Sequence, residues 1–86
     1  MLNQLLRSAT SVGANIAESE YAQSSRDFIS KLSIARKEAN ESRYWLRLFG
    51  AEGLMEKEIA EELCLDAEEL IRILAAIIKS KEEKEK

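Results

Sequence analysis

The sequence contains no proline and no histidine, and it has only three glycines and one cysteine in 86 residues. So few turn-forming residues exclude a turn-rich β fold and leave an all-α fold. Because the imidazole ring is missing, histidine acid–base catalysis and the Glu-x-x-His metal motif of helical bundles are excluded as well. The lone Cys64 has no partner for an internal disulfide, and we expect an inert, packed thiol there.

Long hydrophobic runs are also absent, since the longest unbroken apolar stretch is ILAAII at residues 73–78. No segment has the pattern of a signal peptide or a membrane span, so we expect a cytoplasmic protein. The net charge of −3 is unevenly distributed. Residues 25–50 carry six basic and three acidic side chains, whereas residues 51–86 carry six basic and eleven acidic ones, so the middle of the chain is its only basic part.

Apolar residues recur with helical spacing along three segments of the chain. The predicted helices span residues 2–21, 25–49 and 56–80, and the charged tail at 81–86 is expected to fray. Both connections are short, so neighbouring helices should run antiparallel. The sequence therefore predicts one all-α domain over residues 1–86, an antiparallel up-down helical bundle with three helices in this chain.

Only the second predicted helix has clear signals at its ends. Ser24 is the expected N-cap, Asp27 follows it at capping-box spacing, and Gly50 is placed as the left-handed residue that ends the helix. The first helix has no capping residue, because its apolar pattern is already under way at Leu2. We therefore expect the start of this chain to lie inside a longer structural unit.

Each predicted helix has an apolar face that should build the core. On the second helix this face comprises Phe28, Leu32, Ala35, Ala39, Ser42, Leu46 and Phe49. On the third it comprises Ile59, Leu63, Ala67, Leu70, Leu74 and Ile77. On the first it comprises Leu2, Leu5, Leu6, Ala9, Val12, Gly13, Ile16 and Ala17. Within that last face Ala9, Gly13 and Ala17 form a line of small residues, which would let another helix approach closely.

A second line on the first helix is polar and consists of Ser8, Ser11, Asn15 and Glu18. These residues are poor helix formers, so local propensity does not explain why they are there. One interpretation is a solvent-exposed face. The other is a polar contact line, in which hydroxyl, amide and carboxylate groups bond to a neighbouring helix or subunit and fix its register.

The second helix likewise has a further stripe beside its core face, formed by Ile34, Glu38, Glu41, Trp45 and Leu48. Large apolar side chains in such a stripe need a cover. Three helices offer none, so we expect either a missing helix or another copy of the chain to provide it.

A basic line on the second helix consists of Arg36, Arg43 and Arg47. Arginines at this spacing suit phosphate binding, but a solvated face or an inter-subunit salt-bridge surface explains them as well. Three glutamates, at positions 18, 38 and 41, offer carboxylates for a metal, although ion pairs with Arg7 or Lys31 account for them more simply. We therefore expect no cofactor, no metal, no small-molecule ligand and no enzymatic activity.

Three stretches of the chain resemble the bacterial 23S rRNA-intervening-sequence proteins, which are four-helix bundles. These stretches are QLLRSATSVGANIAES, AQSSRDFISKLSIARKEANESRYWLRLF and LIRILAAIIKS, and together they run from about Gln4 to Ser80. The matching positions in the first stretch are Arg7, Ser8, Ser11, Asn15, Ile16 and Glu18. In the second they are Phe28, Leu32, Ala35, Glu38, Ala39, Glu41 and Trp45.

The resemblance implies a chain that retains helices two to four of the bundle and lacks the first. It also implies self-assembly into a ring-shaped homo-oligomer, commonly a pentamer. Our leading hypothesis is a non-enzymatic, self-assembling protein whose packing and interface residues are Ser8, Ser11, Gly13, Asn15, Glu18, Glu38, Glu41 and Trp45. The alternative is a nucleic-acid-binding accessory subunit that uses the arginines of the second helix.

Overall fold

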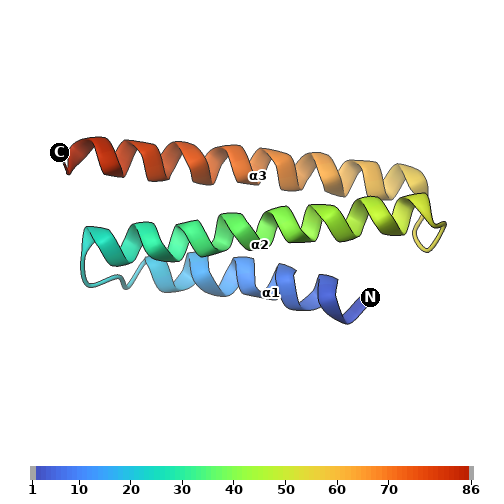
Figure 1. The fold of residues 1–86 in the computed structure, drawn as a ribbon, viewed down its shortest axis with the longest axis horizontal. Helices are drawn as coiled ribbons and strands as arrows, with labels where there is room; N and C mark the ends of the chain where they lie inside the picture. Colours follow the sequence, from blue (N-terminus) through green and yellow to red (C-terminus); the bar gives the residue numbers. More distant parts are fainter. Residues whose placement is uncertain (1, 86) are drawn as a thin grey trace.

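The computed structural model describes residues 2–85 and contains three helices in this part of the chain, with no strand. Helix α1 spans Leu2–Ser19, α2 spans Ser25–Ala51 and α3 spans Lys57–Lys84. The chain reverses direction at each connection, so α1 and α3 both run antiparallel to α2, which lies between them (Figure 1). The predicted all-α fold is thus confirmed.

The start of α2 follows the predicted capping arrangement. Ser24 has an extended backbone, and its hydroxyl accepts a hydrogen bond from the Asp27 amide at 3.0 Å. This bond satisfies one of the amide groups that have no partner within the first turn of a helix. The N-terminal boundary of α2 is therefore encoded locally by the sequence.

The prediction for the end of α2 is wrong in one respect. Gly50 is helical, and the glycine with a positive φ, 72°, is Gly53 in the loop that follows. Gly50 is needed for a different reason, since a Cβ atom there would lie 2.8 Å from the Cβ of Ala60 on α3. The absent side chain lets α2 and α3 approach closely at this end of the bundle.

The other helix ends differ from the predicted ones by a few residues. α1 ends at Ser19 rather than at 21, where i+3 hydrogen bonds to the Ala17 and Glu18 carbonyls tighten the chain into a turn. The tail expected to fray instead continues α3 to Lys84. Glu85 accepts a hydrogen bond from Ser25 at 2.8 Å, which connects this end of α3 to the start of α2. Residue 86, the last of the expected tail, lies outside the described residues.

The core is built mainly from the apolar face predicted for α2. Six of its seven residues are buried, and Phe28 is half-buried. Leu32 and Ala35 form a buried cluster with Leu74 and Ile78 of α3. Ile16 of α1 and Leu70 of α3 pack against this cluster from either side. The core is therefore continuous from α1 to α3 across α2.

α1 lies on α2 in an orientation that the sequence analysis did not predict. Its buried residues are Ser8, Val12 and Ser19, and Ser8 has no exposed surface. Leu2 and Leu6, which were expected in the core, are 61% and 56% exposed. The polar edge of α1 therefore contacts α2, and most of the apolar face does not.

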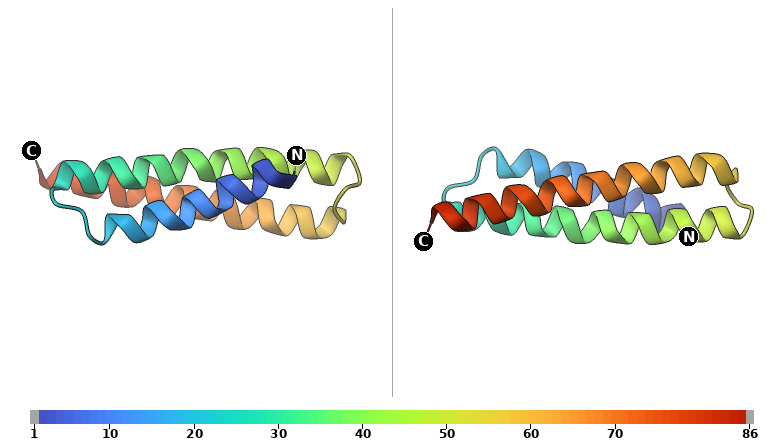
Figure 2. Two further views of the ribbon diagram at one scale, coloured as in Figure 1. Left: turned by 90° about the horizontal axis from the view of Figure 1, so that it is seen from below. Right: turned by 90° about the horizontal axis from the view of Figure 1, so that it is seen from above.

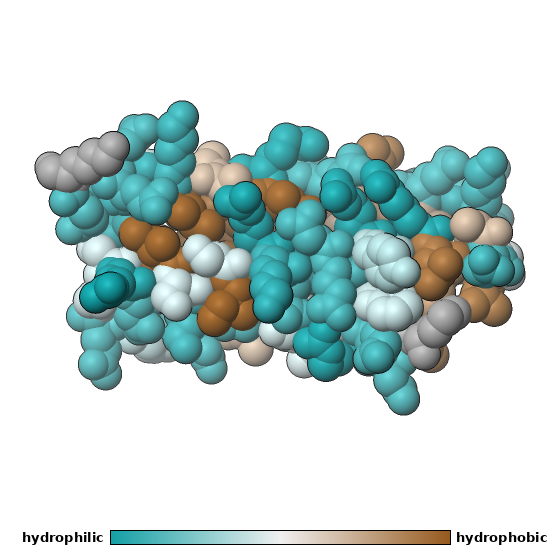
Figure 3. All heavy atoms as spheres, viewed as in Figure 1, coloured by the Kyte–Doolittle hydropathy of each residue, from teal (hydrophilic) through white to brown (hydrophobic). Residues whose placement is uncertain are grey.

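The exposed apolar residues of α1 and α3 lie on the same side of the bundle. α1 and α3 both lie largely on one side of α2 (Figure 2). When the bundle is viewed along the helix axes, the exposed apolar residues of α1 are rotated about the helix axis in one sense from its buried residues. Those of α3 are rotated in the opposite sense from the buried residues of α3. Since α1 and α3 run parallel, both faces turn toward the corner opposite α2. By contrast, the face seen in Figure 1 is mostly hydrophilic, with a few apolar patches (Figure 3).

Candidate interaction surfaces

The polar line on α1 begins with a pair of hydroxyl groups that connects α1 to α2. The Oγ atoms of Ser8 and Ser42 lie 2.8 Å apart, and both residues are buried. Each hydroxyl also lies within hydrogen-bond distance of a carbonyl oxygen on its own helix, Leu5 O at 3.1 Å and Glu38 O at 3.0 Å. Whichever hydroxyl donates across the interface, the other can therefore donate to its own helix, and neither of these two hydroxyls is left without a partner.

Arg7 adds a charged contact beside this pair. Its guanidinium donates to Glu38, at 3.1 Å between Nη1 and Oε2, and to Glu41 through Nη2. The hydrogen bond from Arg7 is the main reason why the pKa of the Glu41 carboxyl is lowered. The same bond raises the pKa of Arg7. Two glutamates of the predicted α2 stripe are thus held by α1 of the same chain.

The remaining residues of the polar line contribute less to the contact with α2. Asn15 donates from Nδ2 to the Ser11 carbonyl at 2.9 Å and to the Ser11 hydroxyl at 3.2 Å, so both residues bond within α1. Glu18 forms an ion pair of 3.4 Å with Lys31 of α2, and both side chains are partly exposed. The line is thus a contact line at its two ends and a local network in its middle.

Trp45 lies at the edge of the α1–α2 contact and is half-buried. Its ring packs edge-on against Tyr44, with the ring centroids 5.1 Å apart, and it lies 6.4 Å from Phe49. Its indole N–H donates weakly to Glu41 at 3.5 Å. Tyr44 remains exposed, and so does Ile34, which lies three turns earlier in the same stripe as Trp45. The second stripe of α2 is therefore covered only in part by α1.

In residues 2–85 no helix lies against the small-residue line on α1. Ala9, Gly13 and Ala17 are all exposed. A Cβ atom at Gly13 would meet no other atom within 4 Å. The close approach expected at Gly13 is therefore not made by any described residue of this chain.

Two residues of the arginine line of α2 pair with the same acidic residue. Glu68 of α3 pairs with Arg47 at 3.2 Å and with Arg43 at 3.7 Å. Arg36 is exposed, and its carbonyl accepts a hydrogen bond from Asn40 within α2. Two of the three arginines thus serve contacts between α2 and α3, an arrangement that the sequence alone could not distinguish from a phosphate-binding line.

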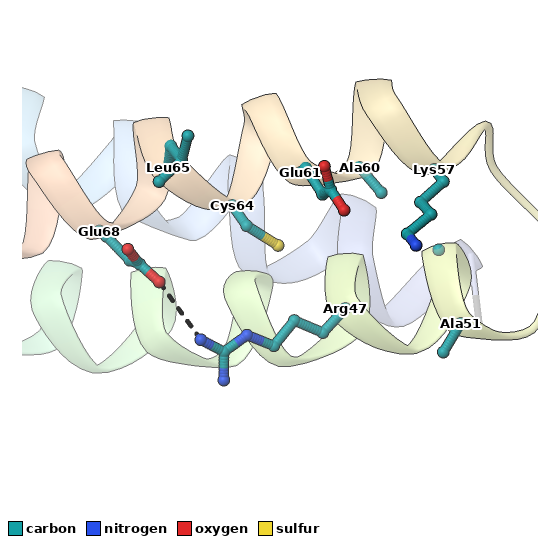
Figure 4. Close-up of a pocket in the computed structure, with 9 residues that line it drawn as sticks. Arg47, Ala51, Lys57, Ala60, Glu61, Cys64, Leu65 and Glu68 are labelled. Atoms are coloured by element: carbon teal, nitrogen blue, oxygen red, sulfur yellow. Dashed lines mark hydrogen bonds and ion pairs between the residues drawn. The ribbon is translucent and has the colours of Figure 1, made fainter.

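An open cavity of about 630 Å³ lies between α2 and α3 near the loop that joins them. Its lining includes Arg47, Lys57, Glu61, Cys64 and Glu68 (Figure 4). The Cys64 thiol points toward α2 and lies 3.9 Å from the Arg43 carbonyl. Burial raises the pKa of this thiol, which favours the protonated, unreactive form. The cavity therefore lacks an activated nucleophile.

The described residues offer no group of three or more carboxylate, thiol or imidazole side chains arranged to hold a metal ion. Glu18, Glu38 and Glu41, which the sequence offered as such a group, are instead paired with Lys31 and Arg7. In residues 2–85 no helix has the length and apolar character needed to cross a membrane.

The fold and contacts define a small all-α protein whose three helices share an apolar core and are joined by polar contacts on both sides of α2. Residues 1–76 match the family described as 23S rRNA-intervening sequence protein, and the chain belongs to this family. No curated protein matches the chain.

A solved structure supports this assignment. The chain is similar to a protein of unknown function from the S23 ribosomal protein family of Bacteroides thetaiotaomicron, with 51% sequence identity and a TM-score of 0.86. The similarity covers 90% of this chain and 71% of the other. The resemblance inferred from the residues is therefore confirmed.

Proposed function

We propose that this protein is a non-enzymatic, cytoplasmic helical-bundle protein whose role is to self-associate into a homo-oligomer. The observation that carries the proposal is the balance of exposed and buried apolar side chains. In residues 2–85, eleven large apolar side chains are exposed, whereas only six of the buried apolar residues are larger than alanine. A chain of this size needs apolar burial to be stable, so a surface of this kind favours association.

The absence of a reactive site in the described residues is consistent with this role but does not carry it. Burial raises the pKa of the Cys64 thiol, and the carboxylates considered for a metal site are paired with Arg7 or Lys31. Self-association explains the apolar exposure without any bound ligand. It also agrees with the expectation from the family resemblance.

The absolute mass of the purified chain, measured by light scattering after size exclusion over a dilution series, tests the proposal. We expect a defined oligomer that dissociates only at low concentration. A monomer across the whole series, with helical circular dichroism retained, would contradict the proposal. The measured mass also distinguishes a dimer from the pentamer that the resemblance implies.

Nucleic-acid binding through the arginine line is the weaker candidate, because Arg43 and Arg47 already pair with Glu68. Binding that weakened with salt and was lost on neutralising the three arginines would support it.

A further inference from the structure

The outer face between α2 and α3 differs in charge from the rest of the chain. In Figure 4, α1 lies behind α2 and α3, so the open cavity between these two helices is on the face away from α1. The cations of this basic face are Arg36, Arg43, Arg47, Lys57, Arg72 and Lys79, and its carboxylates are Glu61 and Glu68. Six cations and two carboxylates give the basic face a net charge of +4, whereas the whole chain has a net charge of −3.

Helical spacing extends the basic face beyond the cavity. Arg72 and Lys79 follow the cavity residue Glu68 by four and eleven positions, which are one and three helical turns along the same side of α3. Arg36 precedes Arg43, a partner of Glu68, by seven positions, or two turns of α2. The cations therefore follow the α2–α3 seam for about 33 Å, from the cavity to Lys79.

Most acidic residues of α3 lie on a different side of the helix. Glu58, Glu62 and Glu69 are exposed, and each directly follows a residue of the basic face, so each is rotated by about 100° from it. A helix is about 10–12 Å across with its side chains, and charges are screened over about 8 Å at physiological ionic strength. These carboxylates therefore cancel the positive potential above the basic face only in part.

Four cations of the basic face form no ion pair with another residue in the range 2–85. They are Arg36, Lys57, Arg72 and Lys79, and all four are exposed. A surface that served only to join two helices would match each cation with a carboxylate. An excess of unpaired cations instead attracts an anion from outside the chain.

Two of these cations lie at nearly the same level on neighbouring helices. Gly50 and Ala60 face each other across the antiparallel α2–α3 seam, and a hydrogen bond at its other end agrees with this register. Counting from this contact places Arg72 within about 3 Å, along the helix axis, of the level of Arg36. Two unpaired guanidinium groups in this arrangement suit a phosphate group, whose oxygens accept hydrogen bonds from the planar fork of arginine.

We propose that the basic face binds the phosphate backbone of a nucleic acid. An extended polyanion is required, because a small anion would reach only one or two cations of a row about 33 Å long. The side chains of the face are mainly charged and polar, unlike the large apolar face of a helix that inserts into a lipid surface. This inference goes beyond the proposed function, and its phosphate contacts do not include the two arginines paired with Glu68.

Titration of the full chain with a labelled single-stranded RNA long enough to span the face, followed by fluorescence anisotropy at several salt concentrations, tests the inference. We expect a dissociation constant of about 10⁻⁴–10⁻⁶ M near physiological salt. For four phosphate contacts, the slope of log affinity against log salt concentration should be about −3. No binding to RNA, or binding to phosphatidylserine vesicles in its place, would overturn the inference and leave self-association standing. Light scattering reports on self-association separately.

A double substitution tests which cations make the contacts. Arg36→Gln combined with Arg72→Gln should weaken binding by about tenfold and reduce the magnitude of the salt slope by about 1.4. Lys37→Gln combined with Lys84→Gln is the matched control, because it removes the same charge from exposed positions outside the basic face. The control should change the affinity by less than about threefold. Equal losses in the two double variants would show that binding follows net charge, and would overturn the inference.

A gain in affinity provides a second test that unfolding cannot imitate. Glu61→Gln removes an exposed carboxylate from the basic face, whereas Glu62→Gln makes the same change one position further around α3. We expect Glu61→Gln to strengthen RNA binding by about two- to threefold more than Glu62→Gln does. Circular dichroism should show that both variants remain helical. An equal or larger gain from Glu62→Gln would contradict the proposed face.

Discussion

α1 and α2 differ in how closely their buried faces follow their apolar patterns. The buried face of α2 is the apolar stripe that its spacing predicts, because this helix has a neighbour on each side. The buried residues of α1 are Ser8, Val12 and Ser19, whereas its leucines at positions 2 and 6 remain exposed. The comparison shows that the orientation of a helix with only one neighbour is set by its contact with that neighbour. The apolar face of such a helix can then remain exposed, on the side where a further helix could pack.

The largest expected effect is the difference between truncating a buried leucine on α2 and truncating an exposed leucine on α1. Leu32→Ala on α2 should lower the free energy of unfolding by about 2–5 kcal/mol, because Leu32 is 3% exposed and its removal leaves a cavity. Leu6→Ala should cost less than about 1 kcal/mol in the monomer, since that side chain is exposed. Urea denaturation at a concentration below the onset of association measures both. Equal losses would mean that Leu6 is buried in the monomer after all.

Two helical glycines should respond to alanine with opposite signs. Gly50→Ala should destabilise the protein by about 1–3 kcal/mol, because the added Cβ atom meets Ala60 and forces α2 and α3 apart. Gly13→Ala should stabilise the monomer by about 0.5–1 kcal/mol, since it improves helix propensity and meets open space. Thermal melts of the two variants provide the test. A destabilising Gly13→Ala would show that something already packs there.

A smaller effect is expected at the hydroxyl pair. Ser8→Ala should cost about 0.5–1.5 kcal/mol, because it removes the hydrogen bond to Ser42 while leaving the Ser42 hydroxyl bonded to the Glu38 carbonyl. Ser33→Ala, at an exposed position on α2, is the control and should change stability little. A Ser8→Ala variant as stable as the control would show that the hydroxyl pair does not hold α1 in place.

The smallest effect concerns pH. Since Arg7 lowers the pKa of Glu41 in the folded chain, the carboxylate stabilises the fold above the ordinary carboxyl range, and this contribution is lost as the pH falls through the lowered pKa. Both groups are exposed, so the change in melting temperature should be slight and reduced by salt. Arg7→Gln should make the melting temperature depend less on pH in the acidic range, whereas Lys31→Gln should not. The same acidic pH dependence of the melting temperature in both variants would contradict this assignment.

Much of the fold follows from the sequence because it depends on local signals. The α2 core stripe and the Ser24 cap are examples, since spacing and capping chemistry act within one helix. The orientation of α1 does not follow, because it is decided by Ser42, Glu38 and Glu41 on another helix. The role of Gly50 was likewise missed, since close approach to Ala60 is a property of two segments.

For the candidate surfaces, too, the sequence predicts some features and misses others. The sequence singled out Gly13 and its small neighbours, and the structure places them on an open face. It could not show that Glu68 pairs with two arginines, because this pairing connects residues 21 and 25 positions apart in the chain.

The hydroxyl contact between Ser8 and Ser42 has a consequence for alignment. Apolar helix faces tolerate sliding, but a hydrogen bond between two short side chains does not, since a shift of one turn moves the partner by about 5.4 Å. The hydrogen bond between Ser8 and Ser42 therefore fixes the register of α1 along α2. Replacing both serines by alanine should therefore leave α1 attached to α2 but less fixed in its position along that helix.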